Sequence, residues 1–285
     1  MDSEKIRKSN LEILAKTARY IAEYPAFITS DMVEETAERC KISREEAFRV
    51  IASGVLDVFE DGFIMRNYIR QMFSRLDAKE YENNLYLQTV KDRGFCGKTW
   101  KMTQMSYKPY EAFVFDDLKK LPDGRIIPQI GYFEREFFYP CIMQNGHEWM
   151  TVTPNEINTM KKPIEKARGD VMTYGLGLGY FAFMAAAKDN VRSVTVVEKD
   201  EEVIELFKEH LLPQFINCDK IKIICGDALE YAAKRPKYDF VFADIWHDPS
   251  DAMEPYLLLR AMERDDVEYA YWIEDTIKCY LPQKT

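Results

Sequence analysis

The spacing of apolar residues changes twice along the chain and predicts three regions. In residues 1–92, apolar side chains such as Leu11 and Leu14 recur at helical spacing, which indicates a helical domain. Residues 93–153 are richer in aromatic and β-branched side chains and predict a small antiparallel β unit. In residues 154–285, short apolar runs alternate with helical patterns, as is typical of a mostly parallel sheet with helices on both faces.

Capping signals predict helix boundaries in the first region. Asp31 with Glu34, and Ser43 with Glu46, have the spacing of a capping box, in which two side chains bond free N–H groups at a helix start. A further helix is expected from Ile64 to about Arg75. The helix that begins after Ser43 is expected to bury one apolar face, made of Ala47, Val50, Ile51 and Val55.

The two helices joined by residues 40–42 have the arrangement of a helix-turn-helix, whose functional version reads DNA. The second helix mixes its arginines with Glu45 and Glu46, and acidic side chains do not favour a phosphate backbone. A packed helical domain is therefore the preferred interpretation.

Turn chemistry organises the second region and its end. Asn145-Gly146 lies between two apolar runs, at 137–144 and 147–152, and is a strong hairpin signal. We expect this hairpin to form a dimer surface or one wall of a substrate pocket. Thr153 is then expected to cap a helix, with Glu156 closing a capping box; Glu156 has the alternative of reaching over a ligand site.

The third region contains five expected strands whose apolar runs are largely unbroken by charge. Strands buried on both faces have this pattern, and a parallel sheet buries them so. The expected strands are 171–174, 193–198, 220–225, 239–245 and 268–273.

A glycine turn follows the first of these strands. Gly175, Gly177 and Gly179 stand at alternate positions between the strand and an apolar helical segment. Glycine permits positive φ and a close approach of the backbone to a ligand. The helix behind the turn points its N–H groups at the same place. We therefore expect a nucleoside cofactor here.

Polar residues also follow the next three strands, and ligands bind at this edge of an open parallel sheet. Glu198 has the position of a carboxylate that accepts ribose hydroxyls, although it also fits a solvated charge run. Asp227 either contacts the cofactor or only caps a helix. Asp244 ends the fourth strand. Their joint order favours the cofactor interpretation.

These motifs resemble the class I S-adenosylmethionine-dependent methyltransferases over about 154–273. The glycines are spaced differently from the G-x-G-x-x-G of dinucleotide sites, which favours S-adenosylmethionine over NAD. The resemblance implies a Rossmann-like fold and a methyltransferase, a transferase acting on a small-molecule acceptor. It implies a cofactor site built from Tyr174, Gly175, Leu176, Gly177, Gly179, Glu198, Lys199, Asp227, Ala228 and Asp244.

Two departures from this family concern the cofactor and the sheet. Thr173 stands where the family often has an acidic residue that holds the methionine amino group, a role that Asp244 or a water would then take. The stretch 274–285 is short for the hairpin that usually ends the family's sheet, so we expect a five-stranded sheet.

The loop after the fourth strand faces the methyl group in this family. Asp244, His247 and Asp248 lie in it and are the candidate catalytic residues. The ordinary pKa of histidine suits a general base. Trp246 either stacks on a flat substrate or packs on a helix. No metal is expected, because His247 and Asp248 are too close in sequence to ligate one metal ion easily.

Two other functions remain open. The hairpin ahead of the nucleotide-binding fold and the acidic loop from Asp244 to Asp248-Pro249 resemble spermidine synthase, an aminopropyltransferase. Leu176 and Leu178 depart from that family, which has an acidic residue among its glycines, and the loop is one residue longer. The second alternative is a non-catalytic cofactor-binding or DNA-binding regulator that uses the N-terminal helices.

Composition narrows the partners. The net charge of −9 among 285 residues argues against general nucleic-acid binding and would suit a polycationic substrate. The six cysteines show no C-x-x-C spacing, which favours free thiols in the cytoplasm. No apolar run reaches membrane-spanning length, so no membrane partner is expected. A homodimer is compatible with the chain.

Overall fold

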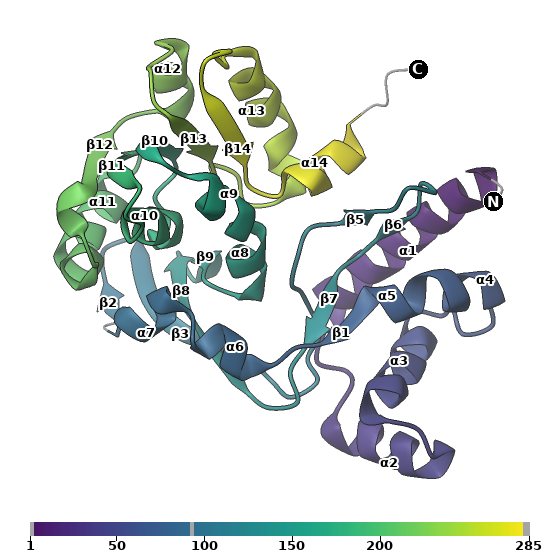
Figure 1. Cartoon of the computed structure of the whole chain (residues 1–285). Helices are drawn as coiled ribbons and strands as arrows, with labels where there is room; N and C mark the ends of the chain where they lie inside the picture. Colours follow the sequence, from purple (N-terminus) through teal and green to yellow (C-terminus); the bar gives the residue numbers. More distant parts are fainter. Residues whose placement is uncertain (1–2, 92–93, 282–285) are drawn as a thin grey trace. The chain divides into compact units, whose positions relative to one another are not determined.

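The computed structural model describes residues 3–91 and 94–281, which form two compact units. Unit 1 comprises residues 1–79 and 106–138, and unit 2 comprises residues 80–105 and 139–285. This division differs from the three predicted domains (1–92, 93–153 and 154–285), because the region 93–153 is shared between both units. Figure 1 shows the elements of the chain.

Unit 1 is largely helical at its start and carries short strands. Its β1, β7 and β4 form a three-stranded sheet in that order, and β5 pairs with β6. The helical elements are α1 (Ser3–Glu23), α2 (Ser30–Cys40), α3 (Arg44–Val55), α4 (Gly62–Ile64), the π-helical η1 (Met65–Ile69) and α5 (Arg70–Met72). The strands are β1 (Phe73–Arg75), β4 (Phe113–Val114), β5 (Lys119–Lys120), β6 (Ile126–Ile127) and β7 (Ile130–Tyr132).

The predicted helix starts in unit 1 are half right. Ser43 caps α3, since its hydroxyl accepts from the Glu46 N–H at 3.2 Å. The capping box predicted at Asp31 is wrong, because Thr29 is the N-cap and α2 already begins at Ser30. The fully buried face of α3 is also shifted from the prediction and comprises Ala47, Phe48, Ala52 and Ser53.

The helix predicted to reach Arg75 ends at Met72. The next three residues form β1 and pair in parallel with β7, so tertiary pairing overrides the helical spacing. Phe48 of α3 stacks on Tyr132 of β7 at 3.8 Å between ring centroids, within one apolar core. The pair α2–α3 has acidic neighbours for its arginines, as in the Arg44–Glu34 ion pair of 2.9 Å.

Unit 2 contains a five-stranded parallel sheet and most of a second, four-stranded sheet in the order β2-β3-β8-β9. Its strands are β2 (Phe95–Cys96), β3 (Trp100–Tyr107), β8 (Phe137–Gln144), β9 (His147–Thr151), β10 (Gly169–Tyr174), β11 (Val191–Glu198), β12 (Ile221–Cys225), β13 (Phe240–Ala243) and β14 (Glu268–Tyr271). Its helical elements are α6 (Ala78–Glu82), α7 (Leu85–Thr89), α8 (Pro154–Thr159), α9 (Lys161–Lys166), α10 (Tyr180–Ala186), α11 (Glu201–Leu206), η2 (Phe207–Leu211), η3 (Leu212–Gln214), η4 (Cys218–Lys220), α12 (Ala228–Ala233), α13 (Pro249–Ala261) and α14 (Glu274–Tyr280).

All five strands predicted for the parallel sheet are confirmed. Their order is β12-β11-β10-β13-β14, with every neighbouring pair parallel, and the sheet has five strands as expected. The chain moves from β10 outward to β12 and then returns to β13 on the other side of β10. This reversal creates a crevice at the carboxyl ends of β10 and β13, where ligands bind in open α/β sheets.

Alternate residues of β13 identify which helices cover each face of the sheet. Phe242 stacks on Phe181 of α10 at 4.3 Å, whereas Val241 and Ala243 belong to the core cluster that contains α12 and α13. Neighbouring strand residues point to opposite faces. Helices therefore cover both faces, which confirms the predicted Rossmann-like class (Figure 1).

The hairpin and helix start predicted ahead of this sheet are confirmed. β8 and β9 pair in antiparallel fashion around Asn145 and Gly146, whose φ values of 50° and 85° suit a tight hairpin turn. Thr153 and Glu156 form the expected capping box at α8. None of the helices within residues 3–91 and 94–281 is long and apolar enough to span a membrane.

Candidate active site

The turn after β10 requires glycine for a steric reason. Gly175 has φ of 93°, and a Cβ built there would lie 1.9 Å from the carbonyl oxygen of Asp244. Gly179 has φ of 73°, and its Cβ would lie 2.4 Å from the Phe207 ring. The Asp244 carbonyl therefore lies close to the Gly175 backbone where β10 and β13 end side by side, so the crevice between these strands has a backbone floor.

Two cavities of unit 2 meet at this crevice. The larger has a volume of about 410 Å³ and the smaller about 260 Å³. The residues that line both are Trp149, Met150, Gly175, Leu176, Gly177, Asp244, Trp246 and His247. A ligand in one cavity can therefore reach a ligand in the other across the glycine turn and Asp244.

The larger cavity collects most of the predicted cofactor residues. It extends past the ends of β11 and β12, where polar side chains suited to a nucleoside gather. The predicted residues that line it are Gly175, Leu176, Gly177, Glu198, Lys199, Asp227, Ala228 and Asp244.

Glu198 and Asp227 are both anchored by backbone N–H groups. One oxygen of Glu198 accepts from the Leu176 N–H at 3.1 Å, and the other accepts from Lys199 and Asp200 at 2.8 and 2.9 Å. Asp227 caps α12 through Oδ1, as one of the two interpretations expected. Each carboxylate oxygen has two lone pairs, so both side chains keep acceptor sites for a ligand.

Tyr174 and Gly179 line neither of these two cavities. The Tyr174 ring packs edge-to-face against Tyr231 at 6.5 Å, under the sheet end. Gly179 is the N-cap of α10, and a Cβ at this position would collide with the Phe207 ring. Both lie behind the glycine turn, and their contact with a cofactor stays a prediction.

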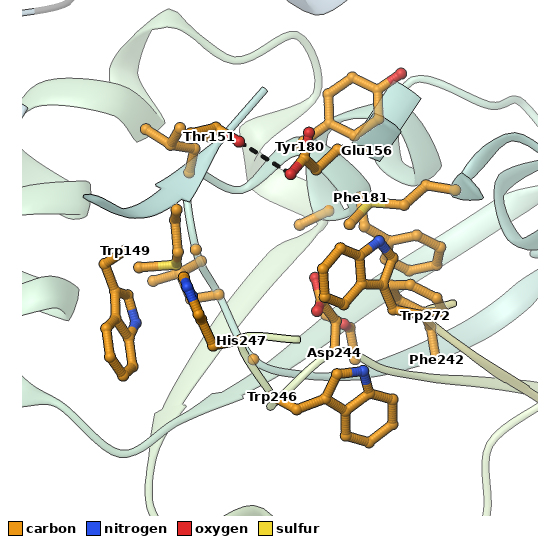
Figure 2. A pocket seen from close by; sticks show the side chains of 18 of the residues that line it. Trp149, Thr151, Glu156, Tyr180, Phe181, Phe242, Asp244, Trp246, His247 and Trp272 are labelled. Atoms are coloured by element: carbon orange, nitrogen blue, oxygen red, sulfur yellow. Dashed lines mark hydrogen bonds between the residues drawn. The ribbon is translucent and has the colours of Figure 1, made fainter. Parts of the chain in front are cut away.

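The smaller cavity combines aromatic walls with carboxylates. Figure 2 shows Asp244 and Glu156 projecting into it, with Trp149 and His247 on one side and Trp272 on the other. Glu148 is its third acidic lining residue, and the described lining residues include no lysine or arginine. Its remaining aromatic lining residues are Tyr180, Phe181, Phe242 and Trp246.

Burial makes these carboxylates unusually basic. It raises the pKa of Asp244 to about 8, and the negative charge of Glu156 adds to this rise. Burial also raises the pKa of Glu156, against opposing hydrogen bonds that include those from the Thr153 hydroxyl, the Thr153 N–H and Thr151 Oγ1. Glu148 is more exposed than these two; partial desolvation raises its pKa and nearby His247 lowers it. Desolvated carboxylates of this kind favour protons or organic cations.

Asp244 itself is fixed by its backbone. Its N–H donates to the Tyr174 carbonyl at 2.9 Å, which continues the ladder between β10 and β13 by one residue. Among the described residues, its side chain makes no hydrogen bond. Asp244 thus presents a carboxyl group with free acceptor capacity at the junction of the two cavities.

His247 lines both cavities, whereas Asp248 lines neither. The His247 ring stacks on Trp149 with centroids 5.5 Å apart, and the backbone N–H of His247 donates to the Asp251 carboxylate at 3.0 Å. Asp248 caps α13 by accepting from the Ser250 N–H at 2.6 Å, and its pKa is lowered chiefly by a hydrogen bond with the Ser250 side chain and further by this backbone bond. The structure therefore brings Asp244 and His247 together and leaves Asp248 at a helix start.

Trp246 follows the packing alternative more than the stacking one. It is 6% exposed and lies parallel to Tyr271, with centroids 6.4 Å apart. An edge of its ring still borders both cavities.

Thr173, at the position where an acidic residue was expected, lines the smaller cavity. Within the described residues, no cluster of three or more metal-ligating side chains occurs.

Several residues of the smaller cavity escaped the sequence analysis. Glu148 and Trp149 come from β9, so the hairpin supplies a wall, but no motif identified these two side chains. Trp272 follows β14 and lay in an expected strand with no assigned role. The only signal available was positional, since both segments adjoin elements that were already expected beside the site.

Comparison with known proteins gives one family match. Residues 168–264, about a third of the chain, match the model of the spermine/spermidine synthase domain. A search of curated proteins found no match. The match overturns the prediction of a methyltransferase and favours the alternative, an aminopropyltransferase, although the resemblance to the shared Rossmann-like fold holds.

Solved structures resemble only part of the chain. A spermidine synthase in complex with the transition-state analogue AdoDATO is 18% identical, with 46% of this chain and 48% of that chain covered and a TM-score of 0.33. The Thermotoga maritima spermidine synthase is also 18% identical, with 46% of this chain and 49% of that chain covered and a TM-score of 0.33. A precorrin 8w decarboxylase of Methanobacterium thermoautotrophicum is 20% identical, with 38% of this chain and 56% of that chain covered and a TM-score of 0.29. The chain spans about half the length of each.

Proposed function

We propose that the chain is a transferase that moves an aminopropyl group from decarboxylated S-adenosylmethionine to an amine. The observation that carries this proposal is the smaller cavity, with three carboxylates and aromatic walls and without a basic lining residue other than His247. The synthase-domain match over 168–264 supports the same chemistry. Aromatic faces and carboxylates both attract ammonium groups.

The two cavities suit the two substrates. The nucleoside lies in the larger cavity, with its ribose hydroxyls toward Glu198. Its sulfonium then sits beside the glycine turn, and the aminopropyl group extends toward Asp244. The amine acceptor occupies the smaller cavity, where Glu156 and Glu148 balance its positive charge. Intact S-adenosylmethionine would bring a carboxylate against these acidic residues, so the site favours the decarboxylated form.

The reaction is a displacement at carbon. The acceptor arrives as an ammonium ion and gives one proton to Asp244, which suits this transfer because its pKa is raised to about 8. The free amine nitrogen then attacks the aminopropyl carbon next to sulfur and forms a C–N bond. The C–S bond breaks, its electron pair stays on sulfur, and neutral methylthioadenosine leaves.

The test is turnover with a defined donor. The chain is incubated with decarboxylated S-adenosylmethionine and either putrescine or 1,3-diaminopropane, and methylthioadenosine and the alkylated amine are measured by mass spectrometry. Asp244→Asn is expected to lower kcat by about 10²–10⁴-fold, the usual contribution of a general base. The matched control is Asp219→Asn, because Asp219 is exposed and borders neither cavity.

Two outcomes would contradict the proposal. Failure of the wild-type chain to release methylthioadenosine with any amine would exclude aminopropyl transfer. Equal loss of activity in Asp244→Asn and Asp219→Asn would instead remove Asp244 from the chemistry.

A further inference from the structure

Trp272 occupies an unusual position at the end of β14. Its N–H donates to the Ala243 carbonyl at 2.9 Å and so extends the pairing of β14 with β13 by one residue. The next residue, Ile273, has φ of 47° and ψ of 34° and is buried. A left-handed conformation is rare for a β-branched side chain, and such strain is retained where the surrounding structure enforces it.

The indole of Trp272 is fixed at its far end as well. Its Nε1–H donates to the hydroxyl of Thr159 at 3.0 Å, and this hydroxyl donates to the Asn155 carbonyl at 2.7 Å. Thr159 and Asn155 lie on α8, the helix that also carries Glu156. The ring plane is therefore held in a fixed relation to one of the carboxylates of the smaller cavity.

Trp272 faces the smaller cavity only. It borders that cavity and is absent from the lining of the larger one. In Figure 2 it lies across the cavity from Trp149 and His247. Trp149 and His247 also line the larger cavity, whereas Trp272 does not, so Trp272 lies on the side of the smaller cavity that faces away from these two residues.

We infer that Trp272 is the end wall of the acceptor site and limits the length of the amine that the chain accepts. This inference rests on the proposed aminopropyl transfer and adds the residue that sets acceptor length. Trp272 is hydrogen-bonded through its backbone N–H and through its indole Nε1, so the ring does not move aside for a longer amine. A small side chain at position 272 would leave room for several more methylene groups of the amine.

The experiment compares acceptors of increasing length. Values of kcat/KM are measured for 1,3-diaminopropane, putrescine, cadaverine and 1,6-diaminohexane with wild type, Trp272→Ala and Trp272→Phe. Trp272→Ala is expected to raise the ratio of long to short diamines by about tenfold or more, the usual discrimination of a wall against added methylenes. Trp272→Phe keeps an aromatic wall and is expected to retain most of the wild-type preference.

Thr159→Val provides a separate test of the bonded indole. It removes the hydroxyl that anchors Nε1 and keeps the side-chain shape, so it should relax the length preference by a smaller factor. The KM for decarboxylated S-adenosylmethionine should stay within about twofold in all three variants, because Trp272 does not border the larger cavity. An unchanged length profile in Trp272→Ala, or an equal rise of donor KM, would overturn the inference.

Failure of the proposed function is recognised separately. If wild type releases no methylthioadenosine with any diamine, aminopropyl transfer is excluded, and the end wall is judged by calorimetric binding of the same diamines to the protein alone. A shift of affinity toward longer diamines in Trp272→Ala then supports the wall. Absence of diamine binding, or binding without such a shift, overturns it.

Discussion

Replacing Glu156 by glutamine separates the two roles of this residue. Glutamine is accepted at the third helical position of a capping box, so the start of α8 should keep its bonds to Thr153. The substitution removes a negative charge that the structure places near Asp244. Because like charges disfavour ionisation, the pKa of Asp244 should fall in the variant.

The structure bounds the size of this effect. The pKa of Asp244 rises from 3.8 to about 8, with burial as the largest cause and Glu156 as the second. Glu156 therefore accounts for less than half of a rise of about 4 pH units, or less than about 2. A fall of about one pH unit, which equals about 1.4 kcal/mol of differential interaction, is the expected result.

The assay is the pH dependence of kcat/KM with a diamine acceptor. Activity needs the ionised form of Asp244, so it rises with pH, and the acid limb should move to lower pH in Glu156→Gln. The KM for the amine should increase at the same time, because one carboxylate of the acceptor site is lost. The matched control is Glu165→Gln, an exposed residue on the neighbouring α9, whose profile should coincide with wild type. An acid limb that stays in place or moves to higher pH would refute the coupling between the two carboxylates.

Three further predictions use other parts of the site. Glu198→Ala should weaken calorimetric binding of methylthioadenosine by about tenfold or more, because each charge-assisted hydrogen bond contributes roughly 1.5–3 kcal/mol; unchanged affinity would exclude ribose contact. Asp248→Ala should lower the free energy of unfolding by about 0.5–2 kcal/mol through loss of the α13 cap, and complete loss of kcat without loss of stability would contradict this. Asp244→Asn should raise Tm relative to wild type more at pH 8 than at pH 5. The folded pKa of Asp244 lies above the unfolded value, so the wild type loses stability as pH rises from about 4 to about 8; a difference that shrinks toward pH 8 would contradict it.

The parallel sheet was predictable because its signals are local. Each of the first four strands is an apolar run that ends at or is followed by a glycine or an acidic residue, and those end residues meet at one edge whatever the rest of the chain does. Gly175 illustrates this, since its need for φ of 93° and for contact with Asp244 leaves no room for another residue. Glu198 and Asp227 were found by the same rule.

Features that depend on tertiary pairing were not predictable in this way. Phe73–Arg75 continue a helical pattern yet form β1, because a partner strand more than fifty residues later is in register with them. Asp248 looked catalytic from its position in the loop, but its side chain is used by the helix that begins one residue later. The aromatic wall of the smaller cavity comes from residues far apart in sequence, so no single motif contains it.

The two cavities also take their lining residues from different segments of the chain. This difference explains why the amine acceptor is harder to identify than the nucleoside donor. Residues that suit the nucleoside, such as Gly175, Glu198 and Asp227, all lie inside the segment matched to the synthase domain. Among the residues that line only the smaller cavity, Glu148, Glu156 and Trp272 lie outside it, whereas others such as Thr173 and Phe181 lie inside it. The family match therefore bears on the donor and on Asp244. Elements that pack against this segment set the size and charge of the acceptor pocket, which can change while the donor chemistry is kept.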